Sequence, residues 1–213
     1  MKCVSALYRR FAAAALIAAG VASVTVLLET NGEWASTASA RERASDYAPI
    51  QHFMGGPKRI ILMRHADKTD DPEDEDLSDA GHARAEHLAT YIPQTFGKPD
   101  FIIATSHSKH SDRPRETVQP LADALGMHVQ HEFEDRDFPD LIQEIFDDPD
   151  YKGKTIVICW HHGNLPAIAA LLGAPAGSYP DPWPEDAFNL VLDLQYDPNS
   201  GSAPAVNRVM EPF

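Results

Sequence analysis

The chain has 213 residues, of which 43% are hydrophobic and 23% are charged. These values suit one globular domain with a substantial core, and they exclude a disordered, collagen-like or disulfide-rich chain. Lysine and arginine number 18 against 32 aspartates and glutamates, so the formal net charge is −14. Such an acidic chain lacks the basic surface that broad nucleic-acid binding requires, although it can still contain a small basic pocket. Two cysteines, Cys3 and Cys159, are too few for a disulfide framework or a cysteine-rich zinc module.

The first 40 residues are expected to be an export signal or a membrane anchor. Lys2, Arg9 and Arg10 precede an uncharged apolar run over residues 11–28, and a small-residue segment ends at Ala40. This order is typical of a signal peptide. At about 1.5 Å per residue the run also nearly spans a bilayer core of about 30 Å, as an uncleaved anchor would. Because the positive charges precede the run, both interpretations predict an extracytoplasmic domain, either periplasmic or secreted.

Residues 41–57 show little periodicity and are predicted to be a linker, which leaves residues 58–213 as the folded domain. Short runs that are apolar on both alternating faces are typical of buried strands. Such runs lie at residues 59–63, 101–104 and 155–159, with weaker candidates at 128–133 and 188–196 and a tail at 205–210. The tail is expected to pair with the segment before it as a hairpin.

Helical patterns alternate with these strands. They cover residues 79–91 after a Ser78 N-cap, 117–125 before Gly126 with Pro114 in a first turn, 138–146, and 165–172 before Gly173. The alternation predicts a three-layer α/β sandwich with a mostly parallel central sheet. The acidic segment 70–76 falls in a loop, which is expected to be a solvated turn or, alternatively, a rim that selects substrates.

Polar side chains follow the predicted strands at their carboxyl ends, where ligands bind in such sheets. Arg64 and His65 follow the first strand, Arg113 lies near the start of the helix after the second, and His162 follows the strand that ends at Cys159. Arginine side chains bind phosphate oxygens bidentately, and a histidine among them can act as a nucleophile. These residue types suit phosphoryl transfer without a metal.

Several segments resemble motifs of the histidine phosphatase superfamily, which has the phosphoglycerate-mutase-like fold. The similar segments are Leu62-Met63-Arg64-His65-Ala66, Leu77 to Ala85, Thr105-Ser106 with Arg113 to Thr117, and His162-Gly163-Asn164. The resemblance covers Arg59 to Gly173. Ala66 stands where most members have glycine, and His107 replaces a proline. The gap inside the second motif is longer than usual, which leaves Arg115 as an alternative to Arg113.

The resemblance implies a phosphomonoester hydrolase without a cofactor or metal. His65 would attack phosphorus and become a phosphohistidine, while Arg64, Arg113 and His162 would hold the phosphoryl oxygens. The other ring nitrogen of His65 is expected to donate to a backbone carbonyl or a similar acceptor, so that the attacking nitrogen stays unprotonated. The substrate would be a small phosphorylated molecule or a phosphoprotein. The acidic segment 70–76 would disfavour polyphosphates by repulsion.

A phosphatase of this kind also needs an acid that protonates the leaving oxygen. The resemblance points to Asp135 as the general acid, with Glu134 and Asp137 as rivals. An aspartate reaches less far than the glutamate that is usual in the superfamily, so its backbone would have to lie closer to the substrate. His161 is expected to be structural rather than catalytic, and Cys159 a buried strand residue.

The sequence leaves open two alternative functions besides that of a histidine phosphatase. One is a catalytically inactive, membrane-tethered domain that binds a phosphorylated ligand without turnover. The other is a metal-dependent hydrolase, because His107 with His110 and His128 with His131 are pairs that can bind zinc beside an acidic residue.

Overall fold

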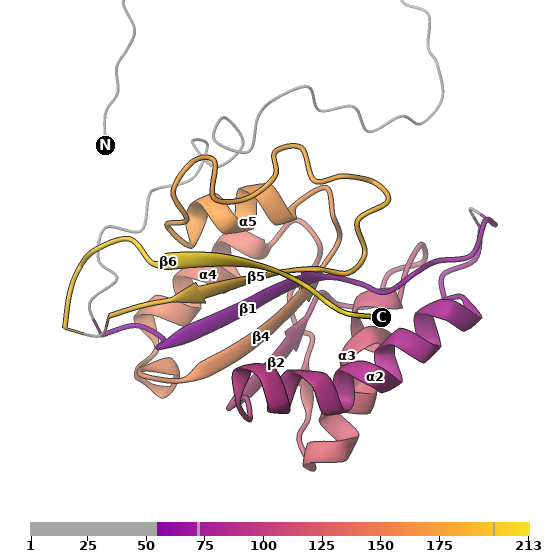
Figure 1. The fold of residues 1–213 in the computed structure, drawn as a ribbon, viewed down its shortest axis with the longest axis horizontal. Helices are drawn as coiled ribbons and strands as arrows, with labels where there is room; N and C mark the ends of the chain where they lie inside the picture. The colour runs from indigo at the N-terminus through magenta and orange to yellow at the C-terminus, as the bar shows by residue number, and fades with distance from the viewer. Residues whose placement is uncertain (1–54, 72, 198) are drawn as a thin grey trace, which may run out of the picture. The chain divides into compact units, whose positions relative to one another are not determined.

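The computed structural model describes residues 55–71, 73–197 and 199–213 (Figure 1). The predicted export segment and the linker before residue 55 lie outside these residues. In chain order the elements are β1 (Arg59–Arg64), α2 (Asp79–Phe96), β2 (Phe101–Ala104), α3 (Arg113–Leu125), β3 (Val129–Gln130), α4 (Phe138–Asp147), a 3₁₀ turn η1 (Pro149–Tyr151), β4 (Thr155–Trp160), α5 (Leu165–Leu171), β5 (Leu190–Gln195) and β6 (Ala205–Met210).

The described strands form one six-stranded sheet in the order β3-β2-β4-β1-β5-β6. The first four strands of this order run parallel to their neighbours, as expected for an α/β sandwich. β5 runs antiparallel to β1, and β6 completes the predicted hairpin with β5. The sheet is therefore mixed, with an antiparallel pair added to a parallel set.

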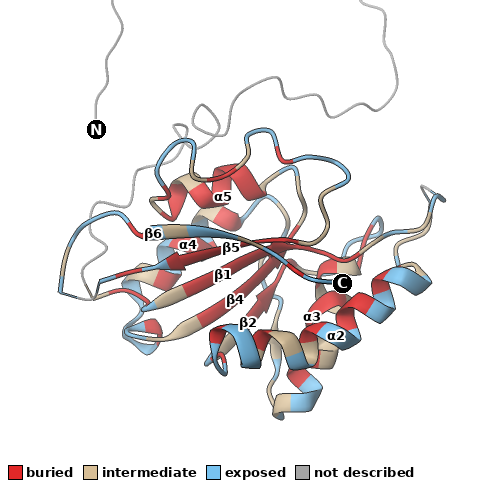
Figure 2. Ribbon diagram, viewed as in Figure 1, coloured by how far each residue is buried: buried red, intermediate tan, exposed pale blue. Residues whose placement is uncertain are grey.

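Alternate strand residues supply the cores on the two faces of the sheet. In β1 and β4 the even-numbered positions, such as Ile60, Leu62, Ile156 and Ile158, share a core with α4 and α5. The odd-numbered positions of these two strands, such as Ile61, Met63, Val157 and Cys159, share a core with α2 and α3. Figure 2 shows the central strands buried between these two helical layers. This arrangement confirms the three-layer architecture, since both faces of a parallel sheet must be covered.

Two predicted boundaries were wrong. α2 continues past the predicted end at residue 91 to Phe96, because Pro93 removes only one amide donor from a helix that is otherwise well packed. α3 begins at Arg113, and Pro114 lies in its first turn as predicted. The segment 128–133 contributes only a two-residue strand, since β3 lies at the sheet edge and pairs with β2 alone.

The entry into α2 holds the loop that follows His65. Ser78 caps the helix by accepting a hydrogen bond from the Gly81 amide, as predicted, and its own amide donates to the Asp67 carbonyl. A Cβ atom on Gly81 would lie 2.2 Å from that carbonyl oxygen. Glycine is therefore required here by the close approach of the loop backbone.

In the part of the chain that the structure describes, no helix is long and apolar enough to span a bilayer.

Candidate phosphate-binding site

The sheet topology brings the predicted site residues to one edge. β1, β4 and β2 are adjacent and parallel, so their carboxyl ends lie together. Arg64 is the last residue of β1, and it lies opposite Trp160 at the end of β4. His65 follows Arg64, and its amide donates to the Trp160 carbonyl over 3.1 Å. The chain segments after β1 and β4 therefore lead into the same site.

His65 is buried, with 3% of its surface exposed. Its Nδ1 lies 2.7 Å from the carbonyl oxygen of Ala66. A neutral ring donates through Nδ1 in this contact and keeps the lone pair on Nε2, which is the arrangement expected for a nucleophile. Burial lowers the pKa of His65 well below its ordinary value, and the charges of His161, Arg64 and Arg113 lower it further. His65 is therefore neutral at pH 7.

Arg64 is a buried cation, with 2% of its surface exposed. Its guanidinium carbon lies 3.7 Å from the centre of the Phe188 ring, and one terminal nitrogen donates to the Glu185 carbonyl. Burial lowers the pKa of Arg64 to about 10, so the side chain stays charged at pH 7. Its Nε atom is buried and has no hydrogen-bond partner among the described residues.

Arg113 has a similar environment at the start of α3. Its terminal nitrogens donate to the carbonyls of Asp74, over 2.6 Å, and His110, over 3.3 Å. Within the described residues its Nε is also buried without a hydrogen-bond partner. Burial lowers the pKa of Arg113, against the acidic residues of the loop that raise it. Its positive charge acts on both Arg64 and His65, which places it in their site.

The structure distinguishes Arg113 from its sequence rival. Arg115 donates to both carboxylate oxygens of Asp112, so its charge is neutralised on α3. Arg113 donates to backbone carbonyls instead. Arg113 therefore stays the predicted phosphate-binding arginine.

His162 is half-buried. Burial and the nearby charge of Arg64 lower its pKa to about 4, so it too is neutral at pH 7. A neutral imidazole can donate to a phosphoryl oxygen while adding no further positive charge. His162 thus lies within electrostatic reach of Arg64, as the motif implies.

Asp135 reaches the candidate site through its contact with His161. Its Oδ1 lies 2.8 Å from Nδ1 of His161, and its Oδ2 accepts from the Asn164 side chain over 2.9 Å. The His161 ring lies 5.5 Å from the His65 ring, centre to centre, at an interplanar angle of 69°. His161, which the sequence leaves as structural, is thus a neighbour of the predicted nucleophile. Its partner Asp135 lies far from it in sequence, so no local pattern indicates the pair.

Two side chains outside the predicted set fix the site backbone. Thr117 Oγ1 accepts from the Ala66 amide and donates to the Arg113 carbonyl, both over 2.7 Å, which ties the two motif segments together. Arg84 forms a buried ion pair with Glu211, and one of its terminal nitrogens reaches the Arg64 carbonyl over 3.4 Å. Neither role is visible from spacing alone.

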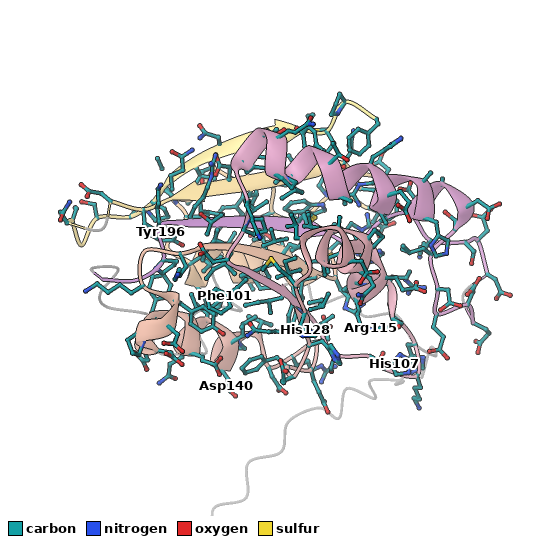
Figure 3. All side chains as sticks on the ribbon, turned by 90° about the horizontal axis from the view of Figure 1, so that it is seen from below. Phe101, His107, Arg115, His128, Asp140 and Tyr196 are labelled. Carbon is teal, nitrogen blue, oxygen red and sulfur yellow. The ribbon has the colours of Figure 1, made fainter. Side chains whose placement is uncertain are left out.

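The sequence pairs proposed for zinc do not form a ligand set. Figure 3 shows His107 and His128, one from each pair, at separate places. His107 lies 3.7 Å from a carboxylate oxygen of Glu75 and of Asp112. In residues 55–71, 73–197 and 199–213, no group of three or more histidine, cysteine, aspartate or glutamate side chains is arranged to hold a metal ion.

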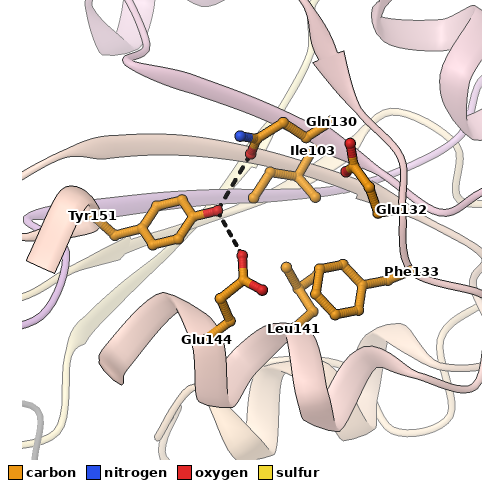
Figure 4. A pocket seen from close by; sticks show the side chains of 7 residues that line it. All are labelled: Ile103, Gln130, Glu132, Phe133, Leu141, Glu144 and Tyr151. Atoms are coloured by element: carbon orange, nitrogen blue, oxygen red, sulfur yellow. Dashed lines mark hydrogen bonds between the residues drawn. The ribbon is translucent and has the colours of Figure 1, made fainter. Parts of the chain in front are cut away.

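A cavity of about 170 Å³ lies elsewhere, between β2, β3 and α4. Figure 4 shows Tyr151 in it, donating to Gln130 over 3.4 Å and to Glu144 over 3.1 Å. The residues that line it carry acidic, amide and apolar side chains and no cation. It is therefore not suited to bind an anion.

Comparison with known proteins supports the fold. No protein-family model matches the chain, and no curated protein is similar to it in sequence. Among solved structures, the protein histidine phosphatase SixA complexed with tungstate is 15% identical, with a TM-score of 0.53 over 71% of this chain and 96% of that one. A mycobacterial glucosyl-3-phosphoglycerate phosphatase is 13% identical, with a TM-score of 0.50 over 72% of this chain and 97% of that one. The chain therefore has the fold of the histidine phosphatases, which confirms the fold that the sequence resemblance implies.

Proposed function

We propose that this protein hydrolyses phosphomonoesters through a phosphohistidine on His65. The observation that carries the proposal is the environment of that imidazole. Its Nδ1 is committed to the Ala66 carbonyl, so the lone pair of Nε2 is free to attack. The ring is neutral and lies within the field of buried Arg64 and half-buried Arg113, which both donate to backbone carbonyls.

The reaction has two displacements at phosphorus. In the first, Nε2 of His65 forms a P–N bond while the bond from phosphorus to the ester oxygen breaks, and the leaving oxygen takes a proton. In the second, water attacks phosphorus, the P–N bond breaks, and inorganic phosphate leaves. Arg64, Arg113 and His162 hold the equatorial oxygens and stabilise their charge in both transition states.

The structural neighbours support a substrate of this class. One is a protein histidine phosphatase in complex with tungstate, a tetrahedral oxyanion like phosphate, and the other is a glucosyl-3-phosphoglycerate phosphatase. From these neighbours we transfer to this chain only the expectation that its substrate carries a phosphoryl group. The substrate is thus a small phosphate ester or a phosphoprotein.

The test is turnover of p-nitrophenyl phosphate by the full chain, together with trapping of an acid-labile phosphate on the protein. His65→Asn, which keeps a polar side chain but lacks Nε2, is expected to abolish both. Exposed His128 offers a matched control, and His128→Asn is expected to retain both. Turnover that survives in His65→Asn would overturn the proposal. Binding of phosphate without turnover would indicate the ligand-binding alternative.

Metal independence is part of the proposal. The two arginines supply the positive charge that a metal ion provides in other phosphatases. Activity is expected to survive EDTA. Loss of activity with EDTA and recovery with zinc would instead support a metal hydrolase.

We also propose that the domain acts outside the cytoplasm. The support is the basic start and apolar run at residues 11–28, with the positive charges before the run. Cell fractionation is expected to recover the protein in the periplasm, medium or membrane. N-terminal sequencing distinguishes a cleaved signal, ending near Ala40, from a retained anchor, and recovery of the intact chain from the cytosol would refute export.

A further inference from the structure

His161 lies where a proton donor for the leaving group is needed. It is the first residue after β4, and the parallel pairing of Arg64 with Trp160 brings it alongside His65. The two rings are 5.5 Å apart, centre to centre, in an edge-to-face arrangement. A phosphoryl group attached to His65 would therefore lie beside His161.

The His161 ring is held in one orientation by Asp135. Nδ1 of His161 lies 2.8 Å from Oδ1 of Asp135, so Nδ1 carries a proton in this contact. The Asp135 backbone is fixed in turn, because its carbonyl accepts from the Trp160 indole over 3.1 Å and from the Asn164 side chain over 2.9 Å. A carboxylate that binds Nδ1 leaves Nε2 as the ring nitrogen that can exchange a proton with substrate.

Asp135 is poorly placed to be the acid itself. Both of its carboxylate oxygens already have donors, one from His161 and one from Asn164. The rivals Glu134 and Asp137 are exposed. The carboxylate is thus placed to compensate the charge of a protonated His161 rather than to reach the leaving oxygen.

The other two site histidines have different roles. His65 must be neutral to attack, and burial keeps it so. His162 is neutral at pH 7 because its pKa lies near 4. Of these three imidazoles, His161 is the one that a carboxylate contacts in the described structure, and such a contact would stabilise an imidazolium.

We propose that His161 is the general acid and base of the phosphatase reaction, with Asp135 as its positioning residue. This inference rests on the proposed function. In the first displacement Nε2 of His161 gives its proton to the ester oxygen as the P–O bond breaks, and His161 becomes neutral while Nδ1 stays bonded to Asp135. In the second, Nε2 takes a proton from the attacking water as the P–N bond breaks, which restores the imidazolium.

The test compares two substrates that differ in their need for an acid. Nitrophenolate is a weak base and leaves without protonation, whereas an alkoxide such as that from glycerol 2-phosphate does not. His161→Asn is expected to lower kcat/KM for glycerol 2-phosphate by about 10²-fold or more, and for p-nitrophenyl phosphate by less than about tenfold. Asparagine places its amide near the position of Nδ1, so the contact with Asp135 can persist.

Asp135→Asn is expected to show the same substrate dependence with a smaller loss. His128→Asn is the matched control and is expected to leave both rates unchanged. Phosphate trapped on His65 should persist in His161→Asn when p-nitrophenyl phosphate is the substrate, which shows that the variant folds. An equal loss on both substrates, or no loss on either, would overturn the role of His161. Turnover that survives in His65→Asn would instead overturn the proposed function.

Discussion

The arginines near the carboxyl edge of the sheet fall into two kinds, which differ in the partners of their guanidinium groups. Arg84 pairs bidentately with Glu211, with nitrogen–oxygen distances of 2.6 and 2.7 Å, so its charge is neutralised. Arg64 and Arg113 donate to backbone carbonyls, and each keeps a buried Nε without a partner among the described residues. A guanidinium in a bidentate ion pair contributes to structure, whereas one that donates to backbone carbonyls is better able to attract an anion.

Arg84, the arginine that pairs with Glu211, also contacts the backbone of Arg64. Arg84 reaches the Arg64 carbonyl, and Glu211 lies in the C-terminal segment, 127 residues along the chain from Arg84. The ion pair thus fastens the chain end and α2 to the last residue of β1. The contrast predicts that substitutions at Arg84 affect folding, and that those at Arg64 and Arg113 affect reaction rate.

The largest effect is expected from breaking the buried ion pair. Arg84→Met leaves the Glu211 carboxylate buried and uncompensated, so the free energy of unfolding should fall by about 3–5 kcal/mol. Arg84→Met combined with Glu211→Leu should recover most of this loss, since no lone charge remains. Urea unfolding of the three proteins measures both effects. A single variant as stable as the parent would refute the structural role of the pair.

Arg64→Met is expected to lower the reaction rate strongly and the stability only slightly. Removing a cation that stabilises the transition state should lower kcat/KM for p-nitrophenyl phosphate by about 10²–10³-fold. The free energy of unfolding should change by less than about 2 kcal/mol, because the lost stacking on Phe188 is offset by removal of a buried charge. Steady-state kinetics and urea unfolding of the same sample compare the two quantities. A large loss of stability with little loss of rate would contradict this contrast.

Two arginines of α3 provide a matched comparison. Arg113→Met should lower kcat/KM by about 10–10²-fold, because it removes a charge that acts on His65. Arg115→Met should leave kcat/KM unchanged and lower stability by at most about 1 kcal/mol, as expected for a partly exposed ion pair. Equal losses of kcat/KM in the two variants would contradict the choice of Arg113 over Arg115 as the phosphate-binding arginine of the second motif.

Acid is expected to weaken the fold through His65, which is buried, and His162, which is half-buried. Burial lowers the pKa of His162 to about 4 and that of His65 well below its ordinary value. An unfolded histidine binds a proton near pH 6.5, so between pH 6.5 and about 4 the unfolded chain binds more protons than the folded one. The free energy of unfolding should therefore fall as the pH falls through this window. His162→Asn should show a smaller fall than the parent protein.

The smallest effect concerns the acidic loop at residues 70–76. Its Asp74 carbonyl binds Arg113, so its carboxylates lie near the site and should repel substrates with several phosphates. Glu73 is exposed, and Glu73→Lys should raise kcat/KM for an inositol polyphosphate, relative to p-nitrophenyl phosphate, by about two- to fivefold at low ionic strength. High salt should remove the gain. Equal use of both substrates by the unaltered protein would contradict the rim interpretation.

Sequence patterns predict most of the fold because they report local physics. The apolar runs at β1, β2 and β4 mark strands buried on both faces, and Ser78 and Gly126 mark helix ends through their capping geometry. The boundaries failed where packing outweighs local preference, as at Pro93 inside α2. β5 and β6 form a hairpin that the sequence predicts. That β5 pairs with β1, however, depends on how the whole sheet assembles.

The candidate site likewise contains features that the sequence predicts and others that it does not. The motifs predict Arg64, His65, Arg113 and His162, because each follows a strand or begins a helix at the edge where ligands bind. The contact of Nδ1 of His65 with a backbone carbonyl, which the sequence leads us to expect, is present in the structure. The metal site suggested by histidine spacing has no counterpart in the described residues, since residues three apart in sequence do not by themselves converge on an ion.

The amino-acid sequence alone determined the order of the strands and helices, the histidine phosphatase resemblance and the residue types that gather at the candidate site, because these depend on periodicity, capping and short motifs. Only the tertiary structure decided which side chains touch across long separations. Within the described residues it placed His161, which contacts Asp135, beside His65, and it paired Arg84 with Glu211 whereas Arg64 donates to a backbone carbonyl. The physical reason is that contacts between parallel strands and a chain end depend on register and packing, which no local pattern of residues records.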